Sequence, residues 1–190
     1  MFLAHPKELH YFSLHHGNGL EWYANHFAEA STEQRCGEVT PYYLFHRLAA
    51  KRIHAEVPKV KLIVLLRDPV DRALSQYFHS KRLGLEPLEL EAAFSAESER
   101  LADADATLQR GESHLSHQQH SYISRSRYEQ QLPRFQALFG SEQLLVLRSE
   151  DLFEQPQRVW ERVLIFLGLA REPLPVDLGR LYGGSGEALQ

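Results

Sequence analysis

The stretch KLIVLLRDPVDRALSQY, residues 61–77, decides the fold class of this chain. Its first part, KLIVLL (residues 61–66), is a continuous apolar run bounded by charge, which is typical of a parallel strand buried on both faces. Pro69 suits the first turn of a helix, which we expect to run to Arg82 and to end near Gly84. A strand that leads directly into a helix favours an α/β fold.

The same strand-then-helix order returns near the C-terminus. QLLVLR (residues 143–148) predicts a second buried strand, and PQRVWERVLIFLGL (residues 156–169) predicts an amphipathic helix. Further helices are predicted over residues 19–27, 42–57, 88–110 and 128–139, the last with Pro133 inside it. Strands alternating with helices predict a parallel sheet flanked by helices.

Three segments carry weaker signals. LHYFS (residues 9–13) resembles a short strand, and a turn is expected at residues 17–19. The segment from residue 112 to 126 is rich in Ser, His and Gln, which predicts a surface loop. The tail, residues 171–190, has little periodicity, and we expect it to lie irregularly on the surface.

Composition excludes several classes of protein. A chain of 190 residues has room for one ordinary domain and hardly for two. Its 43% hydrophobic and 24% charged content is that of a soluble globular protein. No apolar run approaches the roughly 18 residues that span a bilayer. Cys36 is the only cysteine, which excludes an internal disulfide and a Cys-based zinc site.

The net charge of −4 conceals two neighbouring segments of opposite charge, which we call the basic half and the acidic half of this region. Between Arg47 and Arg82 there are nine Lys/Arg against three Asp/Glu, whereas between Leu85 and Glu112 there are eight Asp/Glu against two Lys/Arg. Two solvated helix faces would explain this pattern. An anion-binding site in the basic half would explain it equally well, and that half contains the strand–helix stretch.

The end of the first strand carries groups suited to an anion. Ligands bind at the carboxyl ends of strands in open α/β sheets, where Arg67 would present a planar fork matched to phosphate oxygens. The N–H groups of the following helix, and the hydroxyl of Ser75, could bind the same group. Alternatively, Asp68 caps the helix, and Arg67 and Arg72 form surface ion pairs.

The whole string R-D-P-x-x-R-x-x-S-x-Y resembles the 3′-phosphate-binding motif of sulfotransferases that use 3′-phosphoadenosine 5′-phosphosulfate (PAPS). The resemblance implies a P-loop-like α/β fold in which Arg67 and Ser75 hold the 3′-phosphate of PAPS. It extends from Lys7 to Leu169 and implies a single, partial sulfotransferase domain over residues 1–190. Further along the chain, Leu147–Leu152 and Phe166–Leu169 resemble the closing strand and helix of the family.

Two N-terminal segments resemble heparan sulfate-type and related carbohydrate sulfotransferases. KELHYF (residues 7–12) is similar to their K-E-x-x-F-F segment, and EVTPYY (residues 38–43) to their E-K-T-P-x-Y segment. The resemblance implies that Glu8 is the catalytic base, that Lys7 is an auxiliary cation, and that Tyr128 closes over the nucleotide. Glu8 would serve best if burial raised its pKa. Without the resemblance, an exposed ion pair with Lys7 or a nearby histidine explains Glu8 equally well.

The implied reaction is transfer of a sulfuryl group from PAPS to a hydroxyl or amine of a carbohydrate or glycolipid acceptor. No nucleic-acid partner and no membrane segment in this chain are expected, and the lack of an anchor favours the cytoplasm. The spacing of His114, His117 and His120 is weak for a metal site, so we expect no metal and exposed loop histidines that line a glycan groove. Trp22, Tyr42 and Tyr43 would either stack on sugar rings or pack in the core. (P-loop nucleotide kinases share the fold, but the chain has no Walker A sequence.)

The sequence departs from the family in two places. The family's Gly-rich P-K-x-G-T-T loop, which holds the 5′-phosphosulfate, should precede Lys7, so we expect the fold to be N-terminally incomplete. Gly183–Gly186 lies at the wrong end to replace that loop. The lysine of E-K-T-P is Val39 here. These departures leave open a second function, a non-catalytic remnant that binds nucleotide, glycan or a partner chain.

Overall fold

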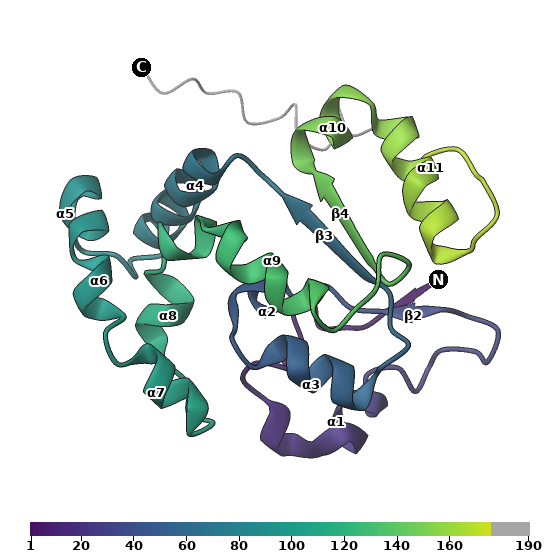
Figure 1. The fold of residues 1–190 in the computed structure, drawn as a ribbon, viewed down its shortest axis with the longest axis horizontal. Helices are drawn as coiled ribbons and strands as arrows, with labels where there is room; N and C mark the ends of the chain where they lie inside the picture. The colour runs from purple at the N-terminus through teal and green to yellow at the C-terminus, as the bar shows by residue number, and fades with distance from the viewer. Residues whose placement is uncertain (176–190) are drawn as a thin grey trace. The chain divides into compact units, whose positions relative to one another are not determined.

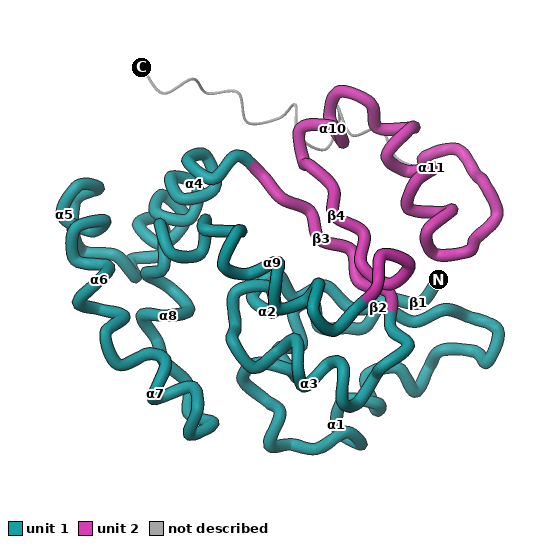
Figure 2. Tube along the Cα trace, in the orientation of Figure 1, with its two compact units in different colours: residues 1–60, 68–139 teal, residues 61–67, 140–190 magenta. Residues whose placement is uncertain are grey.

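The computed structural model describes residues 1–175, which form two compact units. The first unit contains residues 1–60 and 68–139, and the second contains residues 61–67 and the described chain from residue 140 to 175, drawn teal and magenta in Figure 2. Most of the predicted surface tail, including Gly183–Gly186, lies outside the described residues.

The second unit is built on the two predicted strands. β3 (Leu62–Leu66) pairs in parallel with β4 (Leu144–Arg148), and Leu62 lies opposite Leu144. The strands, their parallel pairing and the α/β class are therefore confirmed (Figure 1). Burial of β3 on both faces is wrong, because Ile63 and Leu65 are 42% and 49% exposed. A continuous apolar run can reflect β-propensity as well as burial. It therefore does not show which face of the strand is packed against other residues.

Two helices follow β4 and contact it, α10 (Ser149–Glu154) and α11 (Pro156–Leu167). Val159 and Leu164 are buried on the apolar side of α11, as its amphipathic pattern predicts. α11 ends at Gly168, whose φ of 68° is left-handed and whose lack of a Cβ makes that conformation inexpensive.

The first unit is mostly helical, with one short parallel pair, β1 (Phe2–Leu3) and β2 (Cys36–Gly37). Its helices are α1 (Gly19–Asn25), α2 (Tyr42–Phe45), α3 (Ala49–Glu56), α4 (Pro69–Arg82), α5 (Leu90–Ser95), α6 (Glu97–Arg100), α7 (Ala104–Gln109), α8 (Leu115–Gln119) and α9 (Tyr128–Gln136), with 3₁₀ turns at His16–Asn18 and Ser124–Ser126. All predicted helical regions are confirmed, but residues 42–57 and 88–110 are broken into shorter helices. The first break lies at His46, where ψ is 119°.

α4 begins where the sequence predicts. The Asp68 carboxylate accepts hydrogen bonds from the backbone N–H groups of Val70 and Asp71, at 2.9 and 3.1 Å. Pro69 occupies the first turn, where its missing N–H costs nothing. The helix buries Ala73 and Tyr77 in a cluster that continues into α5 and the segment after α8. The other members of this cluster are Leu88, Leu90, Ala93, Phe94 and Tyr122.

The strand predicted at residues 9–13 is wrong. This segment is a compact turn in which the His10 carbonyl accepts hydrogen bonds from the N–H groups of Ser13, Leu14 and His15. The apolar residues Leu9, Tyr11 and Phe12 are nevertheless buried. The apolar pattern therefore identified core residues and misidentified the backbone.

The surface loop predicted at residues 112–126 is also wrong. It contains α8 and a 3₁₀ turn, and it buries His117, Ser121 and Tyr122 to 4% exposure or less. Two buried carboxylates from the acidic segment fix it in place. Glu97 accepts from the N–H groups of Ile123 and Ser124, both at 2.7 Å, and Glu86 accepts from the Tyr122 hydroxyl at 2.8 Å. The acidic segment is thus partly an internal scaffold rather than a wholly solvated face.

Candidate active site

The turn that carries Glu8 is held in an unusual backbone conformation. Glu8 and His10 have φ angles of 61° and 53°, in the left-handed region that residues other than glycine rarely adopt. The N–H of Glu8 donates to the Val39 carbonyl at 3.1 Å. The Arg52 guanidinium donates to the carbonyls of Phe12 and Ser13, at 3.1 and 2.9 Å, from below the turn. Such strain persists only where surrounding contacts enforce it, and it concentrates at functional sites.

Glu8, His10 and Ser13 form a chain of polar contacts on this turn. The Glu8 carboxylate lies 3.4 Å from Nε2 of His10, and Nδ1 of His10 lies 3.2 Å from the Ser13 hydroxyl. The Ser13 hydroxyl donates to the His10 carbonyl at 3.1 Å, so it accepts from Nδ1–H. Nε2 is then free to exchange a proton with Glu8. Burial lowers the pKa of His10, and the Glu8 charge opposes this.

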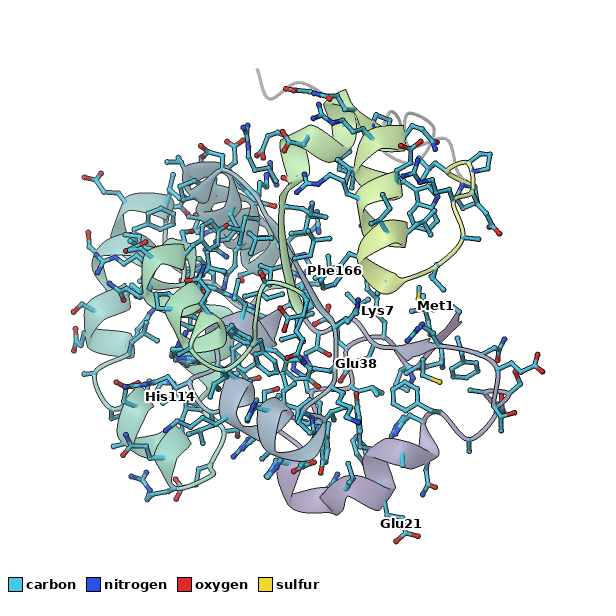
Figure 3. The ribbon with its side chains drawn as sticks, turned by 45° about the vertical axis from the view of Figure 1, so that its right-hand side comes forward. Met1, Lys7, Glu21, Glu38, His114 and Phe166 are labelled. Carbon is cyan, nitrogen blue, oxygen red and sulfur yellow. The ribbon has the colours of Figure 1, made fainter. Side chains whose placement is uncertain are left out.

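The Glu8 side chain itself is 44% exposed, so the burial that we expected around this carboxylate is not present. Of the partners that the sequence left open for Glu8, the structure contains a contact with a nearby histidine, His10. Lys7, the residue before Glu8, is exposed, and it belongs to the same unit as Glu38; both side chains are labelled in Figure 3.

Tyr42 forms a buried platform next to this turn. His10 meets the ring of Tyr42 edge-on at 5.8 Å, and the guanidinium of Arg125 lies over the ring at 5.1 Å. The Tyr42 hydroxyl contacts Nδ1 of His117 at 2.6 Å. Burial lowers the pKa of His117 to about 3, so this histidine is neutral. Tyr42 is 2% exposed, which makes it a core residue rather than a surface for sugar stacking.

A second arginine lies near Arg125. Arg72 donates to the Ser126 hydroxyl at 2.6 Å, to Gln76 at 2.7 Å and to the Tyr122 carbonyl. Burial, followed by the charge of Arg125, lowers the pKa of Arg72 to about 10. The Arg72 side chain therefore ties α4 to the 3₁₀ turn that carries Arg125, rather than forming a surface ion pair.

The EVTPYY segment (residues 38–43) forms hydrogen bonds with the turn that carries Glu8. Glu38 accepts from Thr40 at 2.7 Å and from the Tyr43 hydroxyl at 3.0 Å. Val39 is 48% exposed and brings no charge to the site, although its carbonyl holds Glu8 in place. Val39 stands where the E-K-T-P pattern has a lysine, so the positive charge of that side chain is missing here. The backbone of Val39 still accepts a hydrogen bond from the Glu8 N–H.

The predicted phosphate-binding residues lie on two elements. Arg67 is exposed at the end of β3 in the second unit, and Ser75 is exposed in the second turn of α4 in the first unit. We expected the N–H groups at the start of α4 to bind the phosphate. Two of them instead donate to the Asp68 carboxylate, which caps the helix. Tyr128 begins α9 and lies within electrostatic range of both Arg72 and Arg125.

The three spaced histidines do not form one site. His114 pairs with Asp103 at 2.9 Å, His117 is buried against Tyr42, and His120 contacts the Leu85 carbonyl at 3.0 Å. The prediction that they are exposed loop residues is therefore wrong for all three, because His117 is buried and His114 and His120 are partly buried at the two ends of α8. His114 lies well away from Lys7 and Glu38 in Figure 3. Within residues 1–175, no three His, Cys, Asp or Glu side chains are arranged to hold a metal ion.

Sequence reasoning missed Arg125, and it offered a histidine partner for Glu8 without identifying it as His10. The position of His10, two residues after Glu8, was a usable signal, because a turn brings such residues together. Arg125 gave no signal, because it stands in a polar segment that we interpreted as a loop. Only contacts with residues distant in sequence place it beside Tyr42.

Comparison with known proteins identifies relatives over most of the chain. A family model described as a sulfotransferase domain matches residues 7–178. Human heparan sulfate glucosamine 3-O-sulfotransferase 6 is 33% identical over 169 residues, covering 87% of this chain and 44% of that protein. Membrane-associated sulfotransferase kil1 of Dictyostelium discoideum is 43% identical over 96 residues, covering 46% of this chain and 20% of that protein. The chain spans less than half the length of these curated relatives.

Among solved structures, a sulfotransferase from Alicyclobacillus acidocaldarius superposes with a TM-score of 0.70 at 27% identity, covering 92% of this chain and 73% of that one. The sulfotransferase domain from the curacin biosynthetic pathway superposes with a TM-score of 0.52 at 17% identity, which bears on the fold alone. Within residues 1–175, none of the helices has the length and apolar character needed to cross a bilayer.

Proposed function

The chain belongs to the sulfotransferase domain family and has its P-loop-like α/β fold, and on that premise we propose that it transfers a sulfuryl group from PAPS to a hydroxyl or amine of a carbohydrate. Relatives named as heparan sulfate glucosamine 3-O-sulfotransferases support a carbohydrate acceptor. The observation that carries the proposal is the contact of Glu8 with His10 on a strained and well-anchored turn.

In the proposed mechanism Glu8 removes the proton from the acceptor group as its oxygen or nitrogen bonds to sulfur. PAPS supplies the sulfuryl group, and the bond between sulfur and the phosphate oxygen breaks to release 3′-phosphoadenosine 5′-phosphate. Nε2 of His10, 3.4 Å from the Glu8 carboxylate, can then accept the proton from Glu8. A base placed beside the acceptor contributes general-base catalysis even when it is partly exposed, provided that its geometry is fixed.

The residues proposed to bind the nucleotide are Arg67 and Ser75, with Tyr128 closing over it. Arg67 is suited to a phosphate because a guanidinium offers parallel N–H donors to two oxygens. The exposed hydroxyl of Ser75 adds a donor. Lys7, exposed beside Glu8, is proposed as an auxiliary cation for the sulfuryl or acceptor group.

Calorimetric titration with 3′-phosphoadenosine 5′-phosphate tests the nucleotide site, with ADP as the probe that lacks the 3′-phosphate. We expect preferential binding of the 3′-phosphorylated nucleotide and its loss in Arg67→Ala. Arg158→Ala, which removes an exposed arginine of the same unit, is the control and should bind normally. Equal affinity of the wild type and Arg67→Ala for this nucleotide would refute the assignment.

A non-catalytic nucleotide-binding protein is the second candidate, favoured by the uncharged Val39 beside Glu8. The two candidate functions are distinguished by incubating the protein with sulfur-labelled PAPS and a desulfated heparan-type oligosaccharide. Label on the oligosaccharide supports the enzyme. Nucleotide binding without labelling supports the second candidate.

A further inference from the structure

Arg125 is held in a place that is costly for a charged group. Its side chain is half-buried, and burial lowers its pKa, but a guanidinium remains protonated in proteins. A full positive charge is therefore held partly out of bulk water next to the Tyr42 ring, 5.1 Å away. Placing a charge in such a position is unfavourable unless other groups compensate for it.

The other half-buried arginines of the first unit are compensated by protein acceptors. Arg52 and Arg134 each donate to two backbone carbonyls, Arg72 makes three hydrogen bonds, and Arg100 binds the Glu86 carboxylate twice. These side chains have evident structural roles, because each one ties two segments of the chain together.

Arg125 differs from all four. In the part of the chain that the structure describes, its guanidinium makes one hydrogen bond, a long one of 3.4 Å to the Gln118 carbonyl. No carboxylate of residues 1–175 forms an ion pair with it. Tyr42 is neutral because burial raises its pKa, so the negative charge that acts on Arg125 is that of Glu8, whose carboxylate lies 3.4 Å from Nε2 of His10. Most donors of this guanidinium are therefore left for a group outside the chain.

The backbone that carries Arg125 is fixed before any ligand arrives. The buried carboxylate of Glu97 accepts from the N–H groups of Ile123 and Ser124, and the single hydroxyl hydrogen of Ser126 lies between the Pro69 and Tyr122 carbonyls, 2.8 and 3.1 Å from Oγ. The Tyr42 ring supports the guanidinium itself. A cation fixed in this way loses little conformational entropy when it binds an anion.

We infer that Arg125 binds an anionic substituent of the acceptor, a carboxylate or a sulfate group, beside the hydroxyl or amine that Glu8 deprotonates. The acceptor is then an acidic carbohydrate, and Arg125 is a specificity-determining residue. This inference rests on the proposed function, because it assumes that the acceptor lies at Glu8. A planar guanidinium matches both carboxylate and sulfate oxygens, so the two sources of negative charge must be separated by experiment.

Titration calorimetry with three oligosaccharides of equal length separates them. The first alternates glucuronic acid and N-acetylglucosamine and carries carboxylates only, the second is its N-sulfated form, and the third is neutral oligo-N-acetylglucosamine. For Arg125→Met, which keeps an apolar side chain against Tyr42, we expect the affinity for at least one acidic oligosaccharide to fall about tenfold. The oligosaccharide that loses affinity identifies the anion, and the affinity for the neutral one should stay the same.

Arg127→Met is the matched control, because it removes the same charge from an exposed side chain two residues away. Its affinity for the acidic oligosaccharides should stay within about twofold of the wild type, which separates a site from general attraction of polyanions. Equal losses in both variants would overturn the inference, as would no loss in Arg125→Met. If Arg125→Met does not fold, Arg125→Lys keeps the charge without the planar fork and should weaken binding about threefold or more. Unchanged binding there would also overturn it.

The nucleotide titration keeps this result distinct from the proposed function. Arg125→Met should bind 3′-phosphoadenosine 5′-phosphate with wild-type affinity. A wild type that fails to bind that nucleotide would refute the proposed function. If the wild type binds the nucleotide but Arg125→Met binds the acidic oligosaccharides with wild-type affinity, only the inference about Arg125 is refuted.

Discussion

At the scale of single residues, the chemistry proposed for Glu8 depends on backbone geometry rather than on burial. The carboxylate is 44% exposed, yet the turn beneath it is held by the Val39 carbonyl and by Arg52. A base on a rigid turn keeps its position relative to the acceptor, and rigid positioning supplies much of the rate enhancement in group transfer. His10 adds a second proton acceptor directly behind it.

Glu8→Gln removes the base while keeping the shape of the side chain. We expect sulfuryl transfer to fall about a hundredfold or more, because general-base catalysis contributes at least that much. The affinity for 3′-phosphoadenosine 5′-phosphate should stay the same. Glu21→Gln, an exposed glutamate of α1, is the control and should transfer at the wild-type rate. Comparable rates in Glu8→Gln and in the wild type would exclude Glu8 as the base.

The pH dependence of transfer tests the role of His10. Burial lowers the pKa of His10, and the charges of His15 and Arg125 lower it further, while Glu8 opposes them. Protonated His10 would stabilise the Glu8 carboxylate and make it a weaker base. Transfer should therefore decline toward acid pH with a midpoint below about 6.5, the ordinary value for histidine. A profile of kcat/KM against pH should lose this decline in His10→Asn. A decline that persists in that variant would assign it to another group.

At the scale of elements, local sequence signals predicted the helices and strands whose boundaries are set by residues close in sequence. The β3–α4 junction was predicted almost to the residue, because Asp68 and Pro69 are local start signals and the apolar run is continuous. α11 and its end at Gly168 followed from periodicity and from the left-handed preference of glycine. Such features depend on neighbours within a few residues.

The elements that were mispredicted depend on distant partners. Glu8 and His10 adopt a left-handed backbone that no local propensity favours, and contacts from Val39 and Arg52 enforce it. The segment after α8 is polar, so its composition predicts a loop, but Glu97 satisfies its N–H groups from 26 and 27 residues away. The candidate site combines both kinds of segment. Glu8 was predicted from the family resemblance and not from local signals, whereas Arg125 was not predicted at all.

The cap of α4 gives a stability test for this junction. Asp68→Ala leaves the N–H groups of Val70 and Asp71 without their carboxylate acceptor, and we expect the free energy of unfolding to fall by about 1 kcal/mol. Asp68→Asn retains an acceptor oxygen and should recover most of that loss. Urea unfolding followed by circular dichroism measures both variants. An Asn variant as unstable as the Ala variant would show that the charge of Asp68, and not its capping, provides the stability.

At the scale of the whole molecule, buried titratable groups set the stability in acid. Burial lowers the pKa of His46 to about 4 and that of His117 to about 3, so the native chain keeps both histidines neutral. Burial alone would raise the pKa of Glu86, but hydrogen bonds from Arg100, the Leu88 N–H and Tyr122 outweigh it and lower that pKa to about 2. In each case the unfolded chain takes up a proton at a higher pH than the native one.

The free energy of unfolding should therefore fall in two stages as the pH falls. Between about pH 6.5 and pH 4 the unfolded chain protonates both histidines while the native chain does not, and each proton removes somewhat over 1 kcal/mol of stability per pH unit. From about pH 4.5 toward pH 2, protonation of Glu86 in the unfolded chain removes more. Urea unfolding at a series of pH values measures the slope, which His117→Gln should roughly halve in the first stage, whatever its effect at neutral pH. A slope unchanged by this substitution would mean that His117 is already protonated in the native protein, and its Nδ1–H would then have to donate to the Tyr42 hydroxyl oxygen.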